Sequence, residues 1–288
     1  MRIPESVRKC VVYVGTETTD PGTGTTAIVF RGTGFLVSVP TSIRGKNFHY
    51  IVTAKHVAVM LDREDAFIIS VNSKSGALRG IRAETKQVKW HCHDSDFSAD
   101  VALTPLGADL RDFDIVAMPV GMFVKKSQVE SIGVGPGDEL VISGLFSRHP
   151  GKTKNMPIIR IGHIAMMPDD PVPTQSFGDM EAYLIEARSI GGLSGSPVLL
   201  LKHVYTHEVV VQLYLLGLVH GHWDTPSDAM TDAMGAKSGI LAGVNMGIAI
   251  VTPAQKILDI IESKPLLEER DQIVRDHEAK NIPTKDNQ

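Results

Sequence analysis

Three short segments contain the residue types that serine-dependent hydrolysis requires. His56 lies in YIVTAKHV, Asp100 in SADVAL and Ser194 in GGLSGSP. A serine hydroxyl attacks well only when a neighbouring base accepts its proton, and histidine is such a base near neutral pH. A buried carboxylate holds the histidine in the required tautomer and stabilises its protonated form. These residues therefore predict a catalytic set of His56, Asp100 and Ser194.

The residues around the serine are small. They allow the backbone to turn tightly, so that the N–H groups of Gly192 and Ser194 can converge on one point. Two converging backbone donors can stabilise the oxyanion that forms when the serine attacks a carbonyl carbon. Gly192 and Ser194 are thus the predicted oxyanion hole.

The elements that must position these residues are mostly strands. Clusters rich in Gly, Pro, Asp, Ser and Thr separate short apolar or alternating segments. Those segments are 10–14, 27–30, 34–39, 49–53, 66–71, 101–104, 139–143, 158–164, 183–186, 197–201, 208–219 and 247–251. Many short strands at this spacing predict an all-β sandwich or a pair of barrels, not alternating βα units.

One helix is predicted near the end of the chain. Thr252 is expected to cap it, with Pro253 at its first position and Gln255 completing a capping box. Its apolar face consists of Ala254, Ile257, Leu258 and Ile261. The charged tail 265–288 is expected to be an appended helix or a frayed end, and it could bind a protein partner.

Taken in order, the three segments resemble the trypsin/chymotrypsin-type serine peptidases, in particular the bacterial trypsin-like group that includes the HtrA (DegP-like) proteases. Asp100 follows His56 by 44 residues and Ser194 follows Asp100 by 94, close to the spacing of the chymotrypsin triad. Further segments match in the same order: 32–37 (GTGFLV), 136–144 (PGDELVISG), 186–187 (EA), 217–221 (GLVHG) and 246–251 (MGIAIV).

The resemblance implies two packed six-stranded β-barrels with a C-terminal helix. Residues 1–125 would form the barrel with His56 and Asp100, 126–264 the barrel with Ser194 and the helix, and 265–288 a tail. It also implies a serine endopeptidase that cleaves proteins or peptides through an acyl-enzyme. The expected substrate-binding residues are Arg188, His220, Gly221 and His222, although for Arg188 an outward-pointing side chain is the favoured alternative.

The sequence departs from the family at two positions of the serine segment. Leu193 stands where trypsin-like zymogens have an aspartate, so activation by a cut near the N-terminus is not expected. Ser196 replaces the second glycine after the serine. Outside this segment, no PDZ-like domain is expected after the barrel. These departures leave open a second reading, a catalytically inactive pseudo-protease that serves as a binding or scaffolding module.

Other motifs are weaker. The segment 91–94 (HCHD) resembles a metal cluster, but neighbouring strand positions point in different directions and no second ligand pair follows. The GKT of 151–153 lacks the first glycine of a phosphate-binding loop. A lipase-type elbow would need glycine where Ser196 stands. No metal and no cofactor are therefore predicted.

Composition limits the remaining classes. The 288 residues are 43% hydrophobic and 22% charged, with a net charge of −4. Such a chain lacks the overall basic field of a nucleic-acid binder. Its longest apolar run, residues 209–219, is too short to span a bilayer. Two cysteines and no apparent secretory signal favour a cytoplasmic protein without disulfides.

Overall fold

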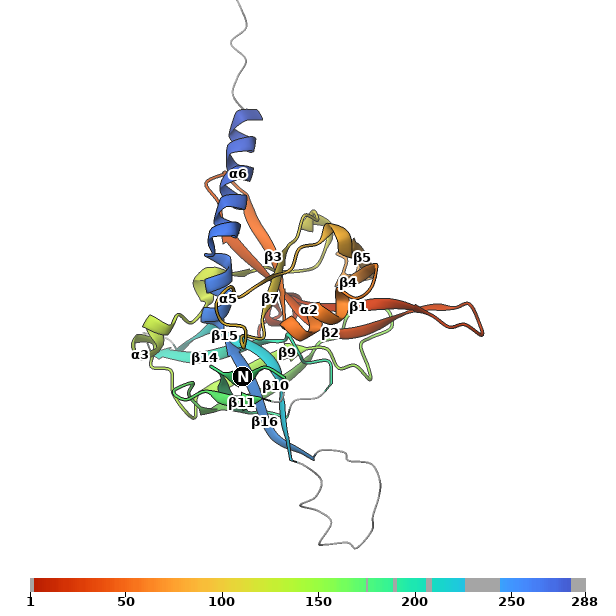
Figure 1. The fold of residues 1–288 in the computed structure, drawn as a ribbon. Helices are drawn as coiled ribbons and strands as arrows, with labels where there is room; N and C mark the ends of the chain where they lie inside the picture. The colour runs from red at the N-terminus through yellow and green to blue at the C-terminus, as the bar shows by residue number, and fades with distance from the viewer. Residues whose placement is uncertain (1–2, 175, 189–190, 206–208, 226–243, 281–288) are drawn as a thin grey trace, which may run out of the picture.

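The computed structural model describes residues 3–174, 176–188, 191–205, 209–225 and 244–280. Strands dominate it, as predicted, and they form two main units (Figure 1). None of the described helices is long and apolar enough to cross a membrane.

The first unit is an eight-stranded sheet in which β5, β4, β1, β2, β3, β7 and β6 are neighbours in that order, while β8 pairs with β2. The strands and helices of this unit are α1 (Ser6–Lys9), β1 (Val11–Thr19), β2 (Thr26–Pro40), β3 (Asn47–Thr53), α2 (Lys55–Leu61), β4 (Ala66–Asn72), β5 (Leu78–Glu84), β6 (His91–Cys92), β7 (Ala102–Pro105) and β8 (Met118–Pro119). The sequence predicted a six-stranded barrel here. The observed sheet has more strands, and its pairing does not close.

The second unit is a closed barrel with the order β10, β13, β16, β15, β14, β9. Its strands are β9 (Glu139–Gly144), β10 (Ile158–Met166), β13 (Tyr183–Glu186), β14 (Pro197–Tyr205), β15 (Val209–Thr225) and β16 (Val244–Pro253). The short helix α3 (Val129–Ile132) precedes the barrel, and β11 (Val172–Thr174) pairs with β12 (Gly178–Met180) beside it. The predicted six-stranded barrel is therefore present in this half.

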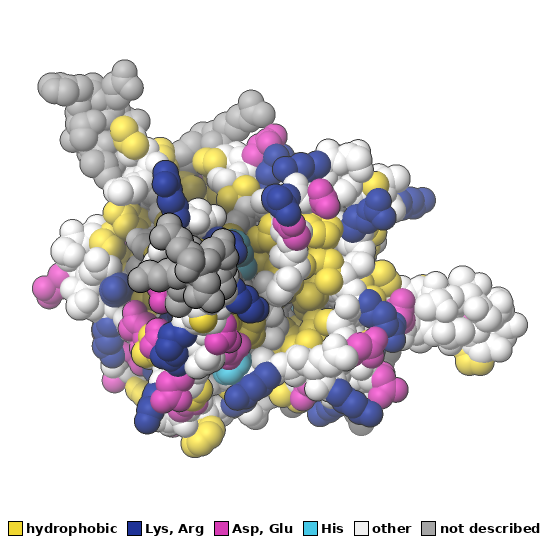
Figure 2. Space-filling view, turned by 90° about the horizontal axis from the view of Figure 1, so that it is seen from above, with side chains coloured by type: hydrophobic (Ala, Val, Ile, Leu, Met, Phe, Trp, Pro, Cys, Tyr) yellow, Lys and Arg dark blue, Asp and Glu magenta, His cyan; other side chains and the backbone are white. Residues whose placement is uncertain are grey.

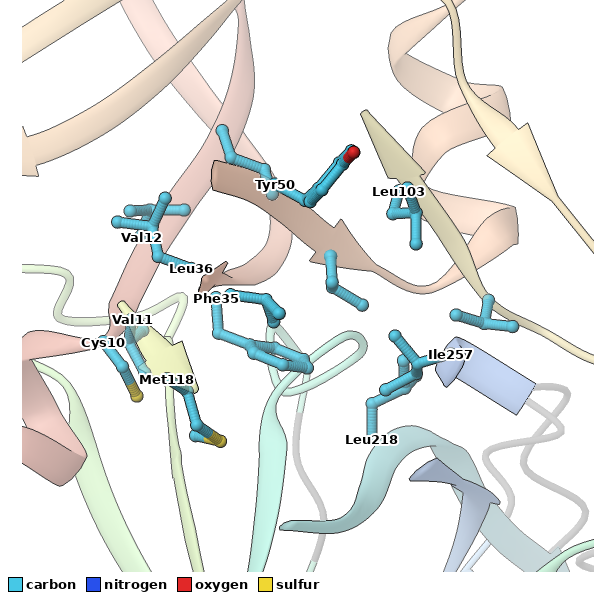
Figure 3. Packing of buried hydrophobic residues seen from close by; sticks show 14 of the residues in the cluster. Cys10, Val11, Val12, Phe35, Leu36, Tyr50, Leu103, Met118, Leu218 and Ile257 are labelled. Carbon is cyan, nitrogen blue, oxygen red and sulfur yellow. The ribbon is translucent and has the colours of Figure 1, made fainter. Parts of the chain in front are cut away.

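One hydrophobic cluster contains residues of both units. Phe35 of β2 and Leu103 of β7 pack in the same buried cluster as Leu218 of β15 and Ile257 of the helix α5 (Ala254–Ile261) (Figure 3). Each of these side chains is essentially excluded from solvent. Burying such a side chain contributes about 1.5–3 kcal/mol. This shared cluster fixes the position of one unit relative to the other, and thus of any site that both build.

The C-terminal region is helical. α5 matches the predicted apolar face, but the capping box is wrong: Pro253 occupies the N-cap position, and the Thr252 hydroxyl is buried at the end of β16 without a partner among the described residues. The described part of the tail forms α6 (Lys264–Lys280), which extends from the body as a rod (Figure 1), whereas residues 281–288 of the predicted tail lie outside the described residues. Arg270 of α6 donates to the Tyr50 hydroxyl of β3 at 3.1 Å, so α6 is docked on the first unit.

An arm projects from the first sheet, formed by residues 16–30 of β1 and β2 (Figures 1 and 2). The Asp20 carboxylate closes its tip by accepting from the N–H groups of Gly22 and Thr23. On the face shown in Figure 2, Lys and Arg side chains lie among Asp and Glu, with hydrophobic atoms between them. This face therefore has no uniformly basic surface.

Candidate active site

Asp100 and His56 form a directly hydrogen-bonded pair. Asp100 precedes β7 and is completely buried, and His56 lies in the first turn of α2, which follows β3. The Nδ1 atom of His56 is 2.7 Å from Asp100 Oδ2, and the His56 backbone N–H donates to Asp100 Oδ1 at 2.9 Å. That N–H is one of the first in α2, which have no partner inside the helix. Two bonds thus fix the histidine against the carboxylate predicted for it.

A second imidazole binds the same carboxylate. The Nδ1 atom of His220 lies 2.6 Å from Asp100 Oδ2, and the His56 and His220 rings are almost perpendicular, at 85° and 5.7 Å between centroids. His220 is the extra residue of a bulge in β15, because Val219 pairs with Val251 and Gly221 with Ile250. A bulge redirects a side chain relative to the regular ladder. His220 was predicted to bind substrate; in the structure its ring contacts Asp100.

The two imidazoles determine the charge state of Asp100. Burial on its own would raise the pKa of this carboxyl, but the hydrogen bonds from His220 and His56 outweigh burial and hold the pKa well below its ordinary value. Asp100 is therefore an ionised carboxylate at neutral pH, with two N–H donors directed at one of its oxygens.

Ser194 does not bond to His56 in this structure. Its hydroxyl donates to the backbone carbonyl of His220 at 3.2 Å. The sequence predicted that His56 would lie within hydrogen-bond reach of both Ser194 and Asp100, and the structure contains the second bond only. Rotation about the single χ1 torsion of serine can redirect the hydroxyl without moving the backbone.

The backbone around Ser194 depends on two glycines with positive φ angles. Gly192 has φ +100° and Gly195 has φ +83°, both in the region that L-residues with a side chain rarely adopt. A Cβ on Gly195 would also lie 2.1 Å from the Thr33 carbonyl oxygen. The small residues of this segment are therefore a geometric requirement of the turn that presents the serine.

Thr33 of β2 joins the first unit to this turn. Its hydroxyl donates to the Gly192 carbonyl at 2.7 Å and accepts from the Leu145 N–H at 2.9 Å. Its own N–H donates to the Ser194 carbonyl at 2.9 Å. Thr33 is fully buried, so these bonds are made away from water. The sequence analysis included Thr33 only in the segment GTGFLV and gave it no role, because its bonding partners lie far along the chain.

The predicted oxyanion donors point away from the carbonyls that hold the turn. The Ser147 hydroxyl donates to the Gly191 carbonyl at 2.9 Å. In a trans peptide the next N–H, that of Gly192, points in the opposite direction. No hydrogen bond between described residues uses the N–H of Gly192 or of Ser194. With respect to the described residues, both N–H groups are thus available for an acceptor from a ligand.

Leu193 supplies apolar packing to the same turn. Its side chain is fully buried in the cluster inside the second barrel, together with Leu140, Ile142 and Val198. An aspartate at this position would bury a carboxylate in an apolar cluster without a cation to pair with it. The departure noted at position 193 is thus accommodated by the core of the barrel.

Asp94 and Asp96, the two other acids near Asp100, have different surroundings. Asp94 is exposed. Asp96 forms an ion pair with Lys256 of α5 at 2.7 Å and accepts from Ser98. His93 of the same segment contacts Asp259 at 3.3 Å. The HCHD segment therefore does not gather its side chains around one point.

The other three predicted substrate-binding residues are either exposed or paired in the second barrel. Arg188 is exposed. Gly221 and His222 pair with Ile250 and Ala249 in the barrel. Phe177, which the sequence analysis did not single out, packs edge-on against both imidazoles, at 5.3 Å from His220 and 6.5 Å from His56 between ring centroids. The Phe177 ring thus lies against one side of both imidazoles.

Comparisons with known proteins identify the fold. No family model matches the chain, and no curated protein sequence matches it. The protease domain of MamO from Magnetospirillum magneticum aligns over 90% of this chain and 98% of its own, with a TM-score of 0.53 and 15% sequence identity. Deg5 aligns over 75% of this chain and 81% of its own, with a TM-score of 0.45 and 17% identity. The match to the MamO domain shows that this chain has the chymotrypsin-like, trypsin-type protease fold, which confirms the predicted resemblance at the level of fold.

Proposed function

We propose that this chain is a serine endopeptidase that hydrolyses peptide bonds through an acyl-enzyme. The observation that carries the proposal is the arrangement of His56 on α2, Asp100 before β7 and Ser194 before β14 in a trypsin-type protease fold. Asp100 holds His56 by Nδ1, which leaves Nε2 as the atom that accepts a proton.

The first step is attack on the scissile carbonyl. The Ser194 hydroxyl leaves the His220 carbonyl and turns to His56, whose Nε2 takes the proton as the oxygen attacks. The imidazolium formed lies against the ionised Asp100, which stabilises its charge. The oxyanion is stabilised by the N–H groups of Gly192 and Ser194. His56 then returns the proton to the leaving amine, and a water molecule releases the acyl group by the same route.

The substrate is an extended peptide or protein segment. The carbonyl that accepts from the Ser194 hydroxyl belongs to His220 of β15. A peptide that lay beside residues 220–222 would therefore have its scissile bond near the serine. The exposed position of Arg188 gives no support for a role in a specificity pocket, so no preference for acidic side chains is proposed.

One observation favours the second candidate, an inactive pseudo-protease that binds peptides without cutting them. The Ser194 hydroxyl is held by the His220 carbonyl rather than by His56. A bond that persisted in the presence of substrate would keep the serine from attack. The two candidates therefore differ in the reactivity of one oxygen.

A fluorophosphonate probe separates the candidates, because it labels only an activated serine. We expect the full chain to be labelled once, at Ser194, and to hydrolyse an unstructured protein such as casein. Ser194→Ala should abolish both and reduce kcat by about 10⁶-fold, as loss of the serine does in subtilisin. Ser196→Ala is the matched control in the same turn: Ser196 is buried and should not affect labelling. Absence of labelling of the folded wild-type chain would contradict the endopeptidase and favour the binding module.

A further inference from the structure

His56, Asp100 and His220 offer three potential metal ligands at one point. One ligand atom from each residue lies within 4.8 Å of the others, and within the part of the chain that the structure describes this is the one cluster of that kind. Both Nδ1 atoms face Asp100 Oδ2, at 2.7 and 2.6 Å, while Oδ1 is occupied by the His56 backbone N–H. The carboxylate oxygen that an ion would bind is thus Oδ2, which both imidazoles share.

The donor set is that of a zinc-type ion. Two imidazoles and one carboxylate bind Zn²⁺ and related divalent transition metals, and three protein ligands leave a fourth position open. Tetrahedral ligands at zinc bond lengths of about 2.0–2.2 Å lie about 3.4 Å apart. Each Nδ1 must therefore withdraw from Oδ2 by less than 1 Å, a movement that rotation of the two side chains can supply.

The cluster can be reached from solvent through its two imidazoles, whereas its carboxylate is buried. The His56 and His220 side chains are 31% and 13% exposed, whereas Asp100 is fully buried. Phe177 covers the two rings from one side. A buried ionised carboxylate attracts a cation strongly, because few waters screen its charge. The nearby Lys55 ammonium opposes the attraction, but it is directed to the Phe97 carbonyl and the Phe177 ring.

We propose that His56, Asp100 and His220 form a binding site for Zn²⁺, and that the bound ion prevents His56 from acting as a base. The first part does not depend on peptidase activity. The second part rests on the function proposed above.

The inhibition follows from the tautomer of the imidazole. Without metal, the Nδ1–H of each histidine donates to Asp100 and Nε2 has a free lone pair. When Nδ1 binds the ion, its proton passes through water to Nε2, so three coordinate bonds form and no net proton is released. The Nε2 of His56 then carries a hydrogen and cannot accept the Ser194 proton. The ion thus blocks the base without touching the serine.

Binding is measured first on the full-length wild-type chain, by calorimetric titration with ZnCl₂ after treatment with a chelator. We expect one ion per chain. Co²⁺ provides a second reading, because a four-coordinate Co²⁺ ion with nitrogen and oxygen ligands has strong visible absorption. A chain that binds no Zn²⁺ at this stoichiometry would overturn the proposal whether or not it hydrolyses peptides.

Three variants locate the site. His220→Asn keeps a side-chain donor for Asp100 but removes the imidazole, and His220→Ala removes both; each should weaken Zn²⁺ binding by about 100-fold or more. His163→Ala is the control, because His163 is an exposed histidine on β10. The Zn²⁺ affinity of this variant should equal that of the wild type. Circular dichroism checks that each variant is folded. Unchanged affinity in folded His220→Asn would overturn the site.

The effect on reactivity is tested with the fluorophosphonate probe. One equivalent of Zn²⁺ should slow labelling of the wild type at least about 10-fold, and a chelator should restore it. Labelling of His220→Asn should not respond to the same Zn²⁺ concentration. If the chain binds Zn²⁺ but labelling stays unchanged, the inhibitory part is wrong. If no labelling occurs at all, the endopeptidase fails, while calorimetry still decides the metal site.

Discussion

The Thr33 hydroxyl has a role that its position in a strand does not reveal. It receives one bond from Leu145 and gives one to the Gly192 carbonyl, so it sets the direction of the peptide groups beside Ser194. Thr33→Val keeps the shape but leaves both buried partners unpaired, at a cost of about 1–3 kcal/mol. We expect kcat for peptide hydrolysis to fall about 10-fold or more while KM changes little, as measured by steady-state kinetics.

Thr33→Ser is the matched control for this prediction, because it restores the hydroxyl and should recover most of kcat. Thr33 is a positioning residue, since it acts through the turn and does not touch the substrate. Equal kcat in the valine and wild-type chains would show that the turn is held without the hydroxyl.

At the residue scale, the sequence was a better guide to which residues build the candidate site than to which of them contact one another. The placement of Asp100 against His56 follows from an acid anchored to a buried strand, and the structure contains that contact. The contact between His220 and Asp100 could not be predicted, because alternation along a strand assumes a regular ladder. The bulge at His220 breaks that alternation and redirects its side chain.

Among the elements, α6 shows how a mostly charged segment can contribute to the fold. Leu266 is fully buried, whereas the neighbouring Leu267 is 44% exposed. We expect Leu266→Ala to lower the free energy of unfolding by about 2–4 kcal/mol, because it removes buried methyl groups and leaves a cavity. Leu267→Ala should change it by less than about 0.5 kcal/mol. Urea unfolding of both variants measures the difference, and equal effects would contradict the docking of α6.

The elements also show where sequence patterns fail. The segments 27–30 and 34–39 were predicted as separate strands, but they form the single long strand β2. Arg31, Gly32 and Thr33 interrupt the apolar pattern between the two segments. β2 nevertheless stays paired with β1 on both sides of them, with a register shift between Val14 and Gly15. α2 was missed because its seven residues are too few to show a helical period.

At the scale of the molecule, one charged cluster ties three regions together. Lys256 of α5 contacts Asp96 of the first unit at 2.7 Å and Glu181 beside the second barrel at 2.9 Å. Partial burial would raise the pKa of Asp96, but hydrogen bonds from Lys256 and Ser98 outweigh it and lower that pKa to about 2. The sequence predicted none of this, because the three partners are distant in the chain.

This pKa predicts a pH-dependent contribution to stability. The Asp96 pKa is lower in the folded chain than its ordinary value of about 4. The carboxylate therefore stabilises the fold above that value, and the contribution disappears as pH falls toward about 2. The difference in unfolding free energy between wild type and Asp96→Asn should be largest near neutral pH and shrink below about pH 5.

Urea unfolding across this range measures that difference, with Asp94→Asn as the control. Asp94 is exposed, and its substitution should have a small effect at every pH. A difference for Asp96→Asn that stays constant, or grows on acidification, would show that the ion pair with Lys256 does not stabilise the fold.

The hydrogen bond between Thr33 and Gly192 can form only late in the synthesis of the chain, because the two residues lie far apart in the sequence. These two residues are separated by 159 positions. A ribosome adds about 5–20 residues per second, so about 8–30 s pass between their synthesis. In the later part of that interval, once residue 100 has been made, the emerging chain carries His56 and Asp100 but no Ser194 and no support for an oxyanion. Under the proposed function, the nascent chain cannot cleave itself or its neighbours, and hydrolysis begins only when its last barrel closes against its first sheet.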